Sequence, residues 1–445
     1  MAFQLLRQIP RNMISETVCR LGPWLHIDFL SRLPFEVCIL ILSFTSPETL
    51  KAVERVSRRW RELAHHPLLA QVIFLRSRYW YNVNRVRRHQ NQTSDPSVLD
   101  DPPALLDPSK LVHPIGKDHW DEEGKPMVNW RSLLFAKRRM EQAWRSLAMV
   151  ANAVSGAHRE AVYCAQFQGD RLVSGGRDCQ VKVWDLPTNQ CLRSLSGHCG
   201  SVLCLQFDPA HIFTGGSDSM ILQWDSLTGE RVGQLEGHEG SVLGVRFNRE
   251  FLVSCSKDKT VRLWDRASRN CLRTMRGHEV AVNAVQFSLR HNLIASGSGD
   301  RTIRIWDLER GDGVRTMEGH GRGVACLEFD GRTLITGASD SLIKLWDVRT
   351  GGCIRTLEGH ESLVRTLAWD GLDRIVSGSY DQTVKVWDLR GSSSAPTFTL
   401  NGLRGHYGRI FKVQFDATRI VSCYQGGSIL SWSIPSPDIP TDFLV

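Results

Sequence analysis

The residues that could do chemistry recur as sets of His, Ser or Thr, and Asp in the second part of the chain. In one set, His198 is followed by Thr214, Asp218 and Trp224, and the same order recurs at nearly the same offsets in the other sets. A hydroxyl, an imidazole and a carboxylate within hydrogen-bonding reach form the catalytic triad of many hydrolases. A nucleophile is needed only once, however, whereas this set occurs six times and two copies have Thr in place of Ser. We therefore predict that the sets are structural and that the chain has no catalytic residue.

These sets belong to a sequence repeat with a period of about 40 residues. Each copy has a Gly-His pair, at His198, His238, His278, His320, His360 and His406, with a variant Gly-Ala-His ahead of them at His158. Each also has a Trp-Asp pair, at Trp184, Trp224, Trp264, Trp306, Trp346 and Trp387, and a seventh Trp, Trp432, is followed by Ser433. Such pairs at this period are the signature of WD repeats. The chain therefore resembles WD-repeat proteins, and we predict an all-β seven-bladed propeller over residues 148–434.

The stretches between these pairs also have the length and turn chemistry of short strands. In the second repeat, four strands are expected at Val202 to Phe207, Ile212 to Gly215, Ile221 to Trp224 and Glu230 to Leu235, separated by Gly, Ser, Asp and Pro. Strands of this length and number are those of one propeller blade.

The resemblance implies that the polar residues of each repeat form one hydrogen-bonded set that joins outer strands to inner ones. Besides the set of His198, the sets are His158/Ser174/Asp178/Trp184, His238/Ser254/Asp258/Trp264, His278/Ser296/Asp300/Trp306, His320/Thr336/Asp340/Trp346 and His360/Ser377/Asp381/Trp387. The seventh repeat has Gly426 in place of the Asp, so His406 lacks its acceptor and this blade is expected to be the least rigid. Because the histidines would lie one per blade around a ring, we predict no metal site and no cofactor.

A ring of blades must close on itself. The tail after Trp432 contains Pro435, Pro437 and Pro440, which cannot donate to a strand ladder. The short apolar segment 148–155 precedes the first blade, and we predict that it supplies the last strand of the seventh blade.

The N-terminal part has helical apolar spacing, at Leu33, Val37, Ile41 and Phe44. The string 28–36 (DFLSRLPFE), then 41–44 (ILSF) and 56–64 (VSRRWRELA), resembles an F-box. With seven WD-type repeats behind it, the chain resembles the F-box/WD-repeat substrate receptors of SCF-type (Skp/cullin/F-box) ubiquitin ligases, the group that includes beta-TrCP and the yeast cell-division-cycle receptors.

The resemblance implies contacts with a Skp-family adaptor. A module of about 45 residues with this many apolar side chains can hardly bury all of them, so an exposed apolar face is expected. The residues expected to bind Skp are Leu33, Pro34, Ile41, Leu42 and Leu50. Trp60 could belong either to this interface or to the core of the module.

The remaining segments complete the predicted organisation. Residues 1–27 are unassigned, 28–75 form the F-box, 76–147 a helical linker, and 435–445 a tail. Within the linker, residues 91–129 contain six of the 17 prolines and eight acidic residues, which indicates a flexible insertion. The resemblance implies that the flanking helices act as a stalk.

The composition indicates the class of protein and the compartment in which it is expected. The 445 residues are 42% apolar and 23% charged, and we expect no membrane-spanning segment and no secretory leader. The 12 cysteines include no CxxC pair, so we expect packing roles in a reducing compartment, the cytosol or the nucleus. Of the net charge of +8, +7 lies in residues 1–150, where contact with nucleic acid and a solvated basic helix face are alternatives.

The resemblance also implies which residues face the upper rim of the propeller: those three and five after each Gly-His histidine, and that before each turn Asp. None of these 21 residues is acidic. The expected substrate-binding residues are the cations Arg365, Arg409, Arg177 and Lys257 and the aromatic residues Tyr163, Tyr380 and Phe411. Three of the arginines fall on blades six, seven and one, so a phosphorylated peptide is the expected ligand. Solvated or carboxylate-paired arginines and an unphosphorylated acidic peptide remain alternatives.

The resemblance thus implies a non-catalytic substrate receptor, bound through a Skp adaptor to a cullin and a RING protein. A propeller scaffold in an RNA-processing or chromatin complex, with its basic first third on nucleic acid, is the alternative.

Overall fold

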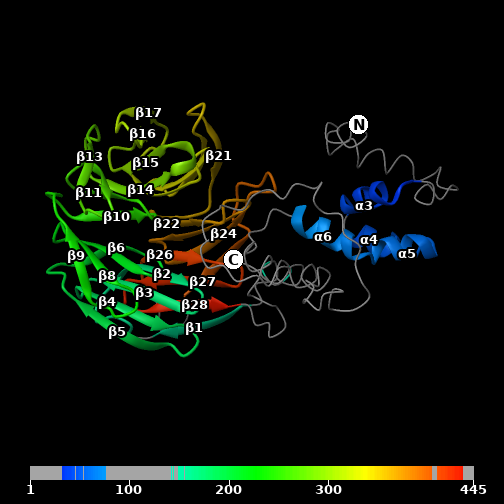
Figure 1. Ribbon diagram of the computed structural model, residues 1–445, viewed down its shortest axis with the longest axis horizontal. Helices are drawn as coiled ribbons and strands as arrows, with labels where there is room; N and C mark the ends of the chain where they lie inside the picture. The colour runs from blue at the N-terminus through cyan, green and yellow to red at the C-terminus, as the bar shows by residue number, and fades with distance from the viewer. Residues whose placement is uncertain are drawn as a thin grey trace. The chain divides into compact units, whose positions relative to one another are not determined.

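The computed structural model describes residues 33–45, 47–53, 55–76, 142, 144, 149–154, 156–402 and 408–433. The chain divides into two compact units, Met1–Glu141 with Pro437–Val445 and Gln142–Ser436. Some predictions lie outside the described residues: the segment 1–27, the start of the F-box at 28–32, most of the linker 76–147 with its insertion 91–129, His406 and the tail 435–445. Figure 1 shows the described elements of both units.

The described helices of the first unit are α3 (Phe35–Ser43), α4 (Pro47–Val53), α5 (Arg58–Ala64) and α6 (Pro67–Arg76). Two of them begin where the sequence supplies a start signal. Pro47 opens α4, where a missing N–H costs nothing, and the Ser57 hydroxyl accepts a hydrogen bond from the Trp60 amide at 3.2 Å to cap α5. The core consists of Cys38, Ile39, Leu42, Leu50, Val53, Trp60, Leu63 and Leu69. Trp60 therefore belongs to the core of the module.

The second unit consists of seven four-stranded antiparallel sheets, so the predicted propeller is confirmed. The first four blades are β2 (Val162–Gln168), β3 (Arg171–Gly176), β4 (Gln180–Asp185) and β5 (Gln190–Ser196); β6 (Val202–Phe207), β7 (His211–Gly216), β8 (Ile221–Asp225) and β9 (Arg231–Leu235); β10 (Val242–Phe247), β11 (Phe251–Ser256), β12 (Val261–Asp265) and β13 (Cys271–Met275); and β14 (Val282–Ser288), β15 (Leu293–Ser298), β16 (Ile303–Asp307) and β17 (Gly313–Met317). The last three are β18 (Val324–Phe329), β19 (Thr333–Ala338), β20 (Ile343–Asp347) and β21 (Cys353–Leu357); β22 (Val364–Trp369), β23 (Arg374–Ser379), β24 (Thr383–Asp388) and β25 (Phe398–Asn401); and β26 (Ile410–Phe415), β27 (Arg419–Tyr424), β28 (Ile429–Ser433) and β1 (Val150–Val154).

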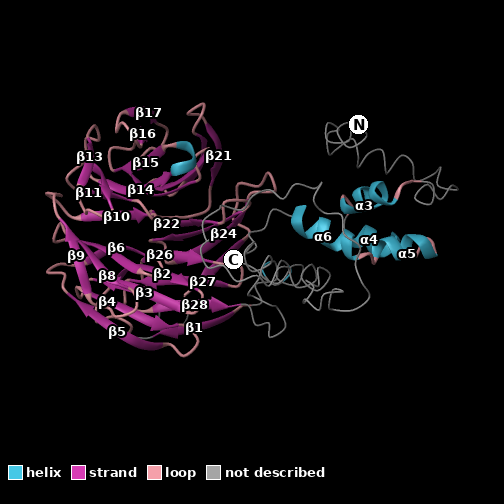
Figure 2. Cartoon of the chain, in the orientation of Figure 1, coloured by secondary structure: helices cyan, strands magenta, loops and turns pink. Residues whose placement is uncertain are grey.

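The described helices and strands separate almost completely between the two units (Figure 2). The exceptions among the described residues are one turn of 3-10 helix, Leu289–His291, in the fourth blade and the helical residues Gln142 and Trp144 ahead of β1. No helix among the described residues is long and apolar enough to cross a membrane.

The innermost strands, β2, β6, β10, β14, β18, β22 and β26, contact one another in succession around the ring axis. A β-bulge interrupts the register near the start of each one, between Val202 and Cys204 in β6 for example. In β6, Leu203 and Gln206 are half-buried while their neighbours are buried. The buried apolar side chains of these strands pack in the cores between neighbouring blades, as Cys204 does with Val242 and Val245 of the next blade.

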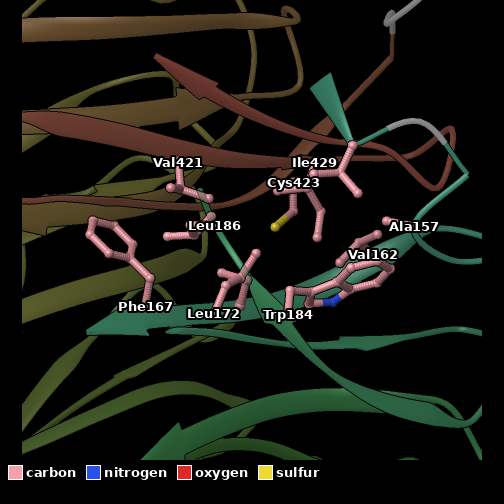
Figure 3. Close-up of a cluster of buried hydrophobic side chains, with 11 residues drawn as sticks. Ala157, Val162, Phe167, Leu172, Trp184, Leu186, Val421, Cys423 and Ile429 are labelled. Atoms are coloured by element: carbon pink, nitrogen blue, oxygen red, sulfur yellow. The ribbon is translucent and has the colours of Figure 1, made fainter. Parts of the chain in front are cut away.

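The ring closes through β1, which comes from before the first blade. It pairs antiparallel with β28, from Val150 opposite Ser433 to Val154 opposite Ile429. Beside this seam, side chains of the last and first blades share one core (Figure 3). Val421, Cys423 and Ile429 lie against Leu172 and Trp184 there. The two ends of the propeller sequence are thus joined both by a strand ladder and by apolar packing.

Trp144 precedes β1 and packs into the second unit. Its side chain is 2% exposed, and its indole N–H donates to the Ala417 carbonyl at 2.8 Å. The Phe415 ring meets it edge-on at 6.1 Å, and the Arg374 guanidinium lies 4.3 Å from its ring centroid. Trp144 therefore fixes the chain on blades six and seven just before the propeller begins.

Candidate functional site

The six complete polar sets have one common geometry. The histidine Nδ1 lies 2.6–2.9 Å from an Asp carboxylate oxygen. Its Nε2 lies 2.7–2.9 Å from the Ser or Thr hydroxyl, which also accepts the Trp N–H at 2.8–2.9 Å. The set thus connects the loop before the innermost strand with the second and third strands of its blade.

Burial determines the proton positions in these sets. It lowers the pKa of His158, His238, His278, His320 and His360, although each has an Asp partner that raises it. In these five sets the neutral imidazole donates from Nδ1 to Asp and accepts at Nε2 from the hydroxyl. Ser174, Thr214 and the four equivalent hydroxyl residues are 0% exposed. Because no substrate can reach these hydroxyls, the triad-like sets hold the blades together.

Blade seven lacks the Asp of this arrangement, and its His406 lies outside the described residues. Gly426 stands where the other blades have Asp, and the Ser422 and Tyr424 hydroxyls are buried without a hydrogen-bond partner among the described residues. The Tyr424 side chain is 0% exposed and packs with Val413 and Trp432. Lower rigidity of this blade stays a prediction.

A second set of repeated hydrogen bonds, from a Gln side chain to the backbone of a neighbouring blade, was not predicted from the sequence. The Gln206 amide accepts from the Phe247 N–H at 2.8 Å and donates to the Phe247 carbonyl at 3.1 Å in the next blade. Gln166 clamps Phe207 in the same way, and Gln414 clamps Phe167 across the closing seam. The signal in the sequence was a Gln eight residues after the histidine in these repeats.

Four of the seven expected substrate-binding residues contact one another. Tyr163, Phe411 and Tyr380, from blades one, seven and six, form an aromatic cluster with edge-to-face contacts at 5.0 and 5.7 Å between ring centroids. The exposed Arg409 guanidinium lies 5.0 Å from the Tyr380 centroid. The structure therefore brings four of the seven residues together.

The other three expected cations lie apart from this cluster in their contacts. Arg177 is exposed and forms an ion pair with Glu160 at 3.1 Å, a pairing that competes with an anionic ligand. Arg365, on β22, is half-buried and donates to the Ala325 carbonyl at 3.5 Å. Lys257, directly after β11, is exposed.

The expected Skp-binding residues differ in accessibility. Leu42 and Leu50 are 2% and 7% exposed and belong to the helical core. They therefore stabilise the module beneath its surface. Pro34 is exposed, and Leu33 and Ile41 are half-buried at the edge of the core. Two further apolar residues, Phe44 and Val56, are exposed, and the sequence analysis had not singled out either as a contact residue.

Metal binding and cysteine chemistry have few candidate residues in the described part of the chain. In the described part of the chain, no group of three or more His, Cys, Asp or Glu side chains could hold a metal ion. Cys164, Cys204 and Cys326 are buried, as the packing role requires, whereas Cys191, Cys271 and Cys353 are exposed on outer strands. The packing prediction is wrong for these three residues, because the blade edge, unlike its middle, faces solvent.

Comparison with known proteins agrees with this architecture. Residues 30–76 match the family described as F-box-like, and six segments match WD domain, G-beta repeat: 152–185, 189–225, 229–265, 269–307, 311–347 and 351–388. The fold and these matches define a WD-repeat propeller preceded by an F-box-like helical module. The seventh blade, which lacks the polar set, has no matching segment among these six.

Among similar proteins, F-box/WD repeat-containing protein lin-23 of Caenorhabditis elegans is 38% identical over 193 residues, which are 40% of this chain and 28% of that protein. F-box/WD repeat-containing protein 7 of Drosophila melanogaster is 32% identical over 180 residues, 40% of this chain and 12% of that protein. Cell division control protein 4 of Candida albicans is 25% identical over 203 residues, 45% of this chain and 26% of that protein. The chain therefore belongs to the F-box/WD-repeat proteins, although it aligns with less than a third of the length of these relatives.

Proposed function

We propose that the chain is the non-catalytic substrate receptor of an SCF-type ubiquitin ligase, acting in the cytosol or the nucleus. The observation that supports this most strongly is the pairing, in one chain, of an F-box-like helical module with a propeller. A similar protein of Arthroderma otae, 27% identical over 180 residues, is named a probable E3 ubiquitin ligase complex SCF subunit. Its match covers 38% of this chain and 24% of that protein.

The proposed mechanism is proximity. The helical module binds a Skp adaptor and through it a cullin and a RING protein, while the propeller holds a target protein. A target lysine is thereby kept at high effective concentration near the ubiquitin-loaded E2 enzyme. Transfer needs no reactive side chain in this chain, which is consistent with six triad-like sets whose hydroxyls are buried.

The adaptor surface is assigned to the accessible apolar residues at the start of the module. Pro34 is exposed and Leu33 and Ile41 are half-buried, so an apolar partner can cover them without unfolding the core. Leu33→Ala with Pro34→Ala is expected to abolish capture of a Skp protein while target binding by the propeller remains, since the two units are separate.

The matched control removes two exposed apolar side chains from the propeller, Leu192→Ala with Ile354→Ala, and should leave Skp capture intact. Undiminished Skp binding by a folded Leu33/Pro34 double variant would overturn the adaptor assignment. RNA association that nuclease abolishes, with no Skp capture by the unmodified chain, would instead favour the scaffold alternative.

The target site is assigned to Arg409, Arg365 and the aromatic cluster of Tyr163, Tyr380 and Phe411, with a phosphorylated peptide as ligand. Arginine binds phosphate through parallel charge-assisted hydrogen bonds, and the half-buried rings offer apolar contact beside it. Arg177 joins this site only when it leaves Glu160.

Arg365→Ala with Arg409→Ala is expected to weaken capture of the phosphorylated target by more than about tenfold, and phosphatase treatment of the target should do the same. Arg390→Ala is the control, because Arg390 pairs with Asp388 at the opposite end of β24 from Tyr380. If neither the double variant nor phosphatase changes capture, the target binds elsewhere.

A further inference from the structure

Residues 389–397 form an unusually long connection between the third and fourth strands of blade six. In blades one to five, four or five residues join the same two strands. The longer connection, called here the blade-six loop, contains three consecutive serines, Ser392, Ser393 and Ser394, and all three are exposed. The repeat that the other blades share therefore does not account for this loop.

The blade-six loop lies against the outermost strand of blade five. The Arg355 guanidinium, on β21, donates to the Leu389 carbonyl at 3.3 Å and to the Ser393 carbonyl. The Glu358 N–H, just after β21, donates to the Ser394 carbonyl at 2.9 Å. The backbone of the serine run is thus held on blade five, while the serines themselves remain accessible.

Arg355 has donors left for an anionic partner. A guanidinium carries five N–H groups, and no carboxylate among the described residues pairs with Arg355. Because this guanidinium is bonded to the Ser393 carbonyl, a phosphate on the Ser393 hydroxyl would lie within its reach. The Ala395 N–H, which donates to the Ser393 hydroxyl at 3.2 Å, is a second donor beside that position.

The loop also carries a charge by which a protein kinase could recognise it. Arg390 is exposed and stands three residues before Ser393. Protein kinases select their substrates by charges at fixed distances from the acceptor, and a cation at this distance suits an arginine-directed kinase. Arg390 pairs with Asp388, but a pair at the surface contributes little and can be exchanged for an acidic groove of the kinase.

We propose that Ser393 is a phosphorylation site and that Arg355 binds the phosphate. In the transfer, the Ser393 hydroxyl oxygen attacks the γ-phosphorus of ATP, the bond to the ADP oxygen breaks, and the hydroxyl proton passes to the base of the kinase. The phosphate has a charge of about −1.5 to −2 at neutral pH and forms charge-assisted hydrogen bonds with arginine. The modified loop is thereby fixed along β21. This proposal does not rest on the receptor role.

The first test asks whether the site is modified. The full chain is incubated with ATP and the catalytic subunit of an arginine-directed serine kinase, and phosphopeptides are mapped by mass spectrometry. Phosphate is expected on Ser393 and should be absent from Ser393→Ala. Arg390→Met should slow the modification at least about tenfold, whereas the control Arg349→Met, an exposed arginine in the corresponding turn of blade five, should not. No phosphate on Ser393 of the unmodified chain would overturn the proposal.

The second test asks whether Arg355 binds the phosphate. Trypsin cleaves after the exposed Arg390, and cleavage of the phosphorylated chain should be at least about fivefold slower than that of the unphosphorylated chain, because a fixed loop opens less often. Arg355→Met should remove this difference. Arg315→Met is the matched control and should retain it, since Arg315 has the same register in blade four and donates to the carbonyls of the next turn, which has no serine run.

The ratio of the two cleavage rates is compared within each variant, so a direct effect of the phosphate on trypsin cancels. An equal ratio in the unmodified chain and in Arg355→Met would overturn the assignment of Arg355. Failure of either test leaves the receptor role to its own experiment, because neither Ser393 nor Arg355 belongs to the helical module that is expected to capture Skp.

Discussion

Replacement of Trp144 should destabilise the propeller, although this residue precedes its first strand. Trp144→Ala removes a side chain that is 2% exposed, together with its 2.8 Å hydrogen bond to Ala417 and its stacking on Arg374. Loss of a buried Trp costs about 3–5 kcal/mol, so we expect about 4 kcal/mol. At about 2 °C per kcal/mol for a unit of this size, the melting temperature should fall by about 8 °C.

Trp144→Phe separates packing from hydrogen bonding. Phenylalanine keeps the apolar contact with Phe415 and loses the N–H donor, so its cost should be about 1 kcal/mol, or about 2 °C. The assay is thermal and urea unfolding of the full chain, with hydrogen exchange of β26 and β27 to locate the effect. Leu192→Ala, at a side chain that is 58% exposed, is the control and should change stability by less than about 0.5 kcal/mol. Equal stability of the Ala and Phe variants would refute the packing argument.

Three further predictions concern the ring. Because burial lowers the pKa of the five histidines described above, the unfolded chain binds more protons below about pH 6.5; stability should therefore fall between pH 7 and 5, by at most about 1.4 kcal/mol per pH unit for each histidine, and a flat profile of unfolding free energy would contradict this. Gln206→Ala should cost about 2 kcal/mol in urea unfolding because two hydrogen bonds to Phe247 are lost, whereas Gln286→Ala, at the same offset but bonded to Glu328, has no such clamp and should cost less. Deletion of Val150–Val154 should lower the melting temperature of the whole ring because β28 loses its partner, and an unchanged value would mean that another segment takes that place.

The sequence was sufficient for features that lie within one repeating unit. The order of His198, Thr214, Asp218 and Trp224 recurs in six blades, with 16 to 18 residues from the histidine to the hydroxyl residue and 10 from there to the Trp, and the hydrogen bonds join the equivalent residues in each one. The same holds for the short helices of the first module, where Pro47 and Ser57 mark helix starts by local chemistry. Such contacts can be predicted because both partners lie close together in the sequence, within one repeat or one helix start.

The residues of the candidate sites could be predicted only in part from such local sequence signals. Their positions in the repeat placed Tyr163, Tyr380 and Phe411 among the expected rim residues. The edge-to-face contacts of these rings depend on which blades are neighbours. The pairing of Arg177 with Glu160 depends on how the loops of one blade fold. Apolar spacing likewise did not distinguish Leu42, which is buried, from the half-buried Ile41 beside it.

Contacts between units of the repeat were decided by the tertiary structure. Trp144 bonds a carbonyl 273 residues away, and Gln414 clamps a strand 247 residues away. The charges of Arg246, Glu328, Arg365 and Lys412 come from four blades, and Arg246 and Glu328 stand at the offset where other repeats have Gln. A repeat pattern reports what every blade has in common, so it cannot report interactions to which each blade contributes a different side chain. Such groups form only when the closed ring brings the innermost strands around one axis.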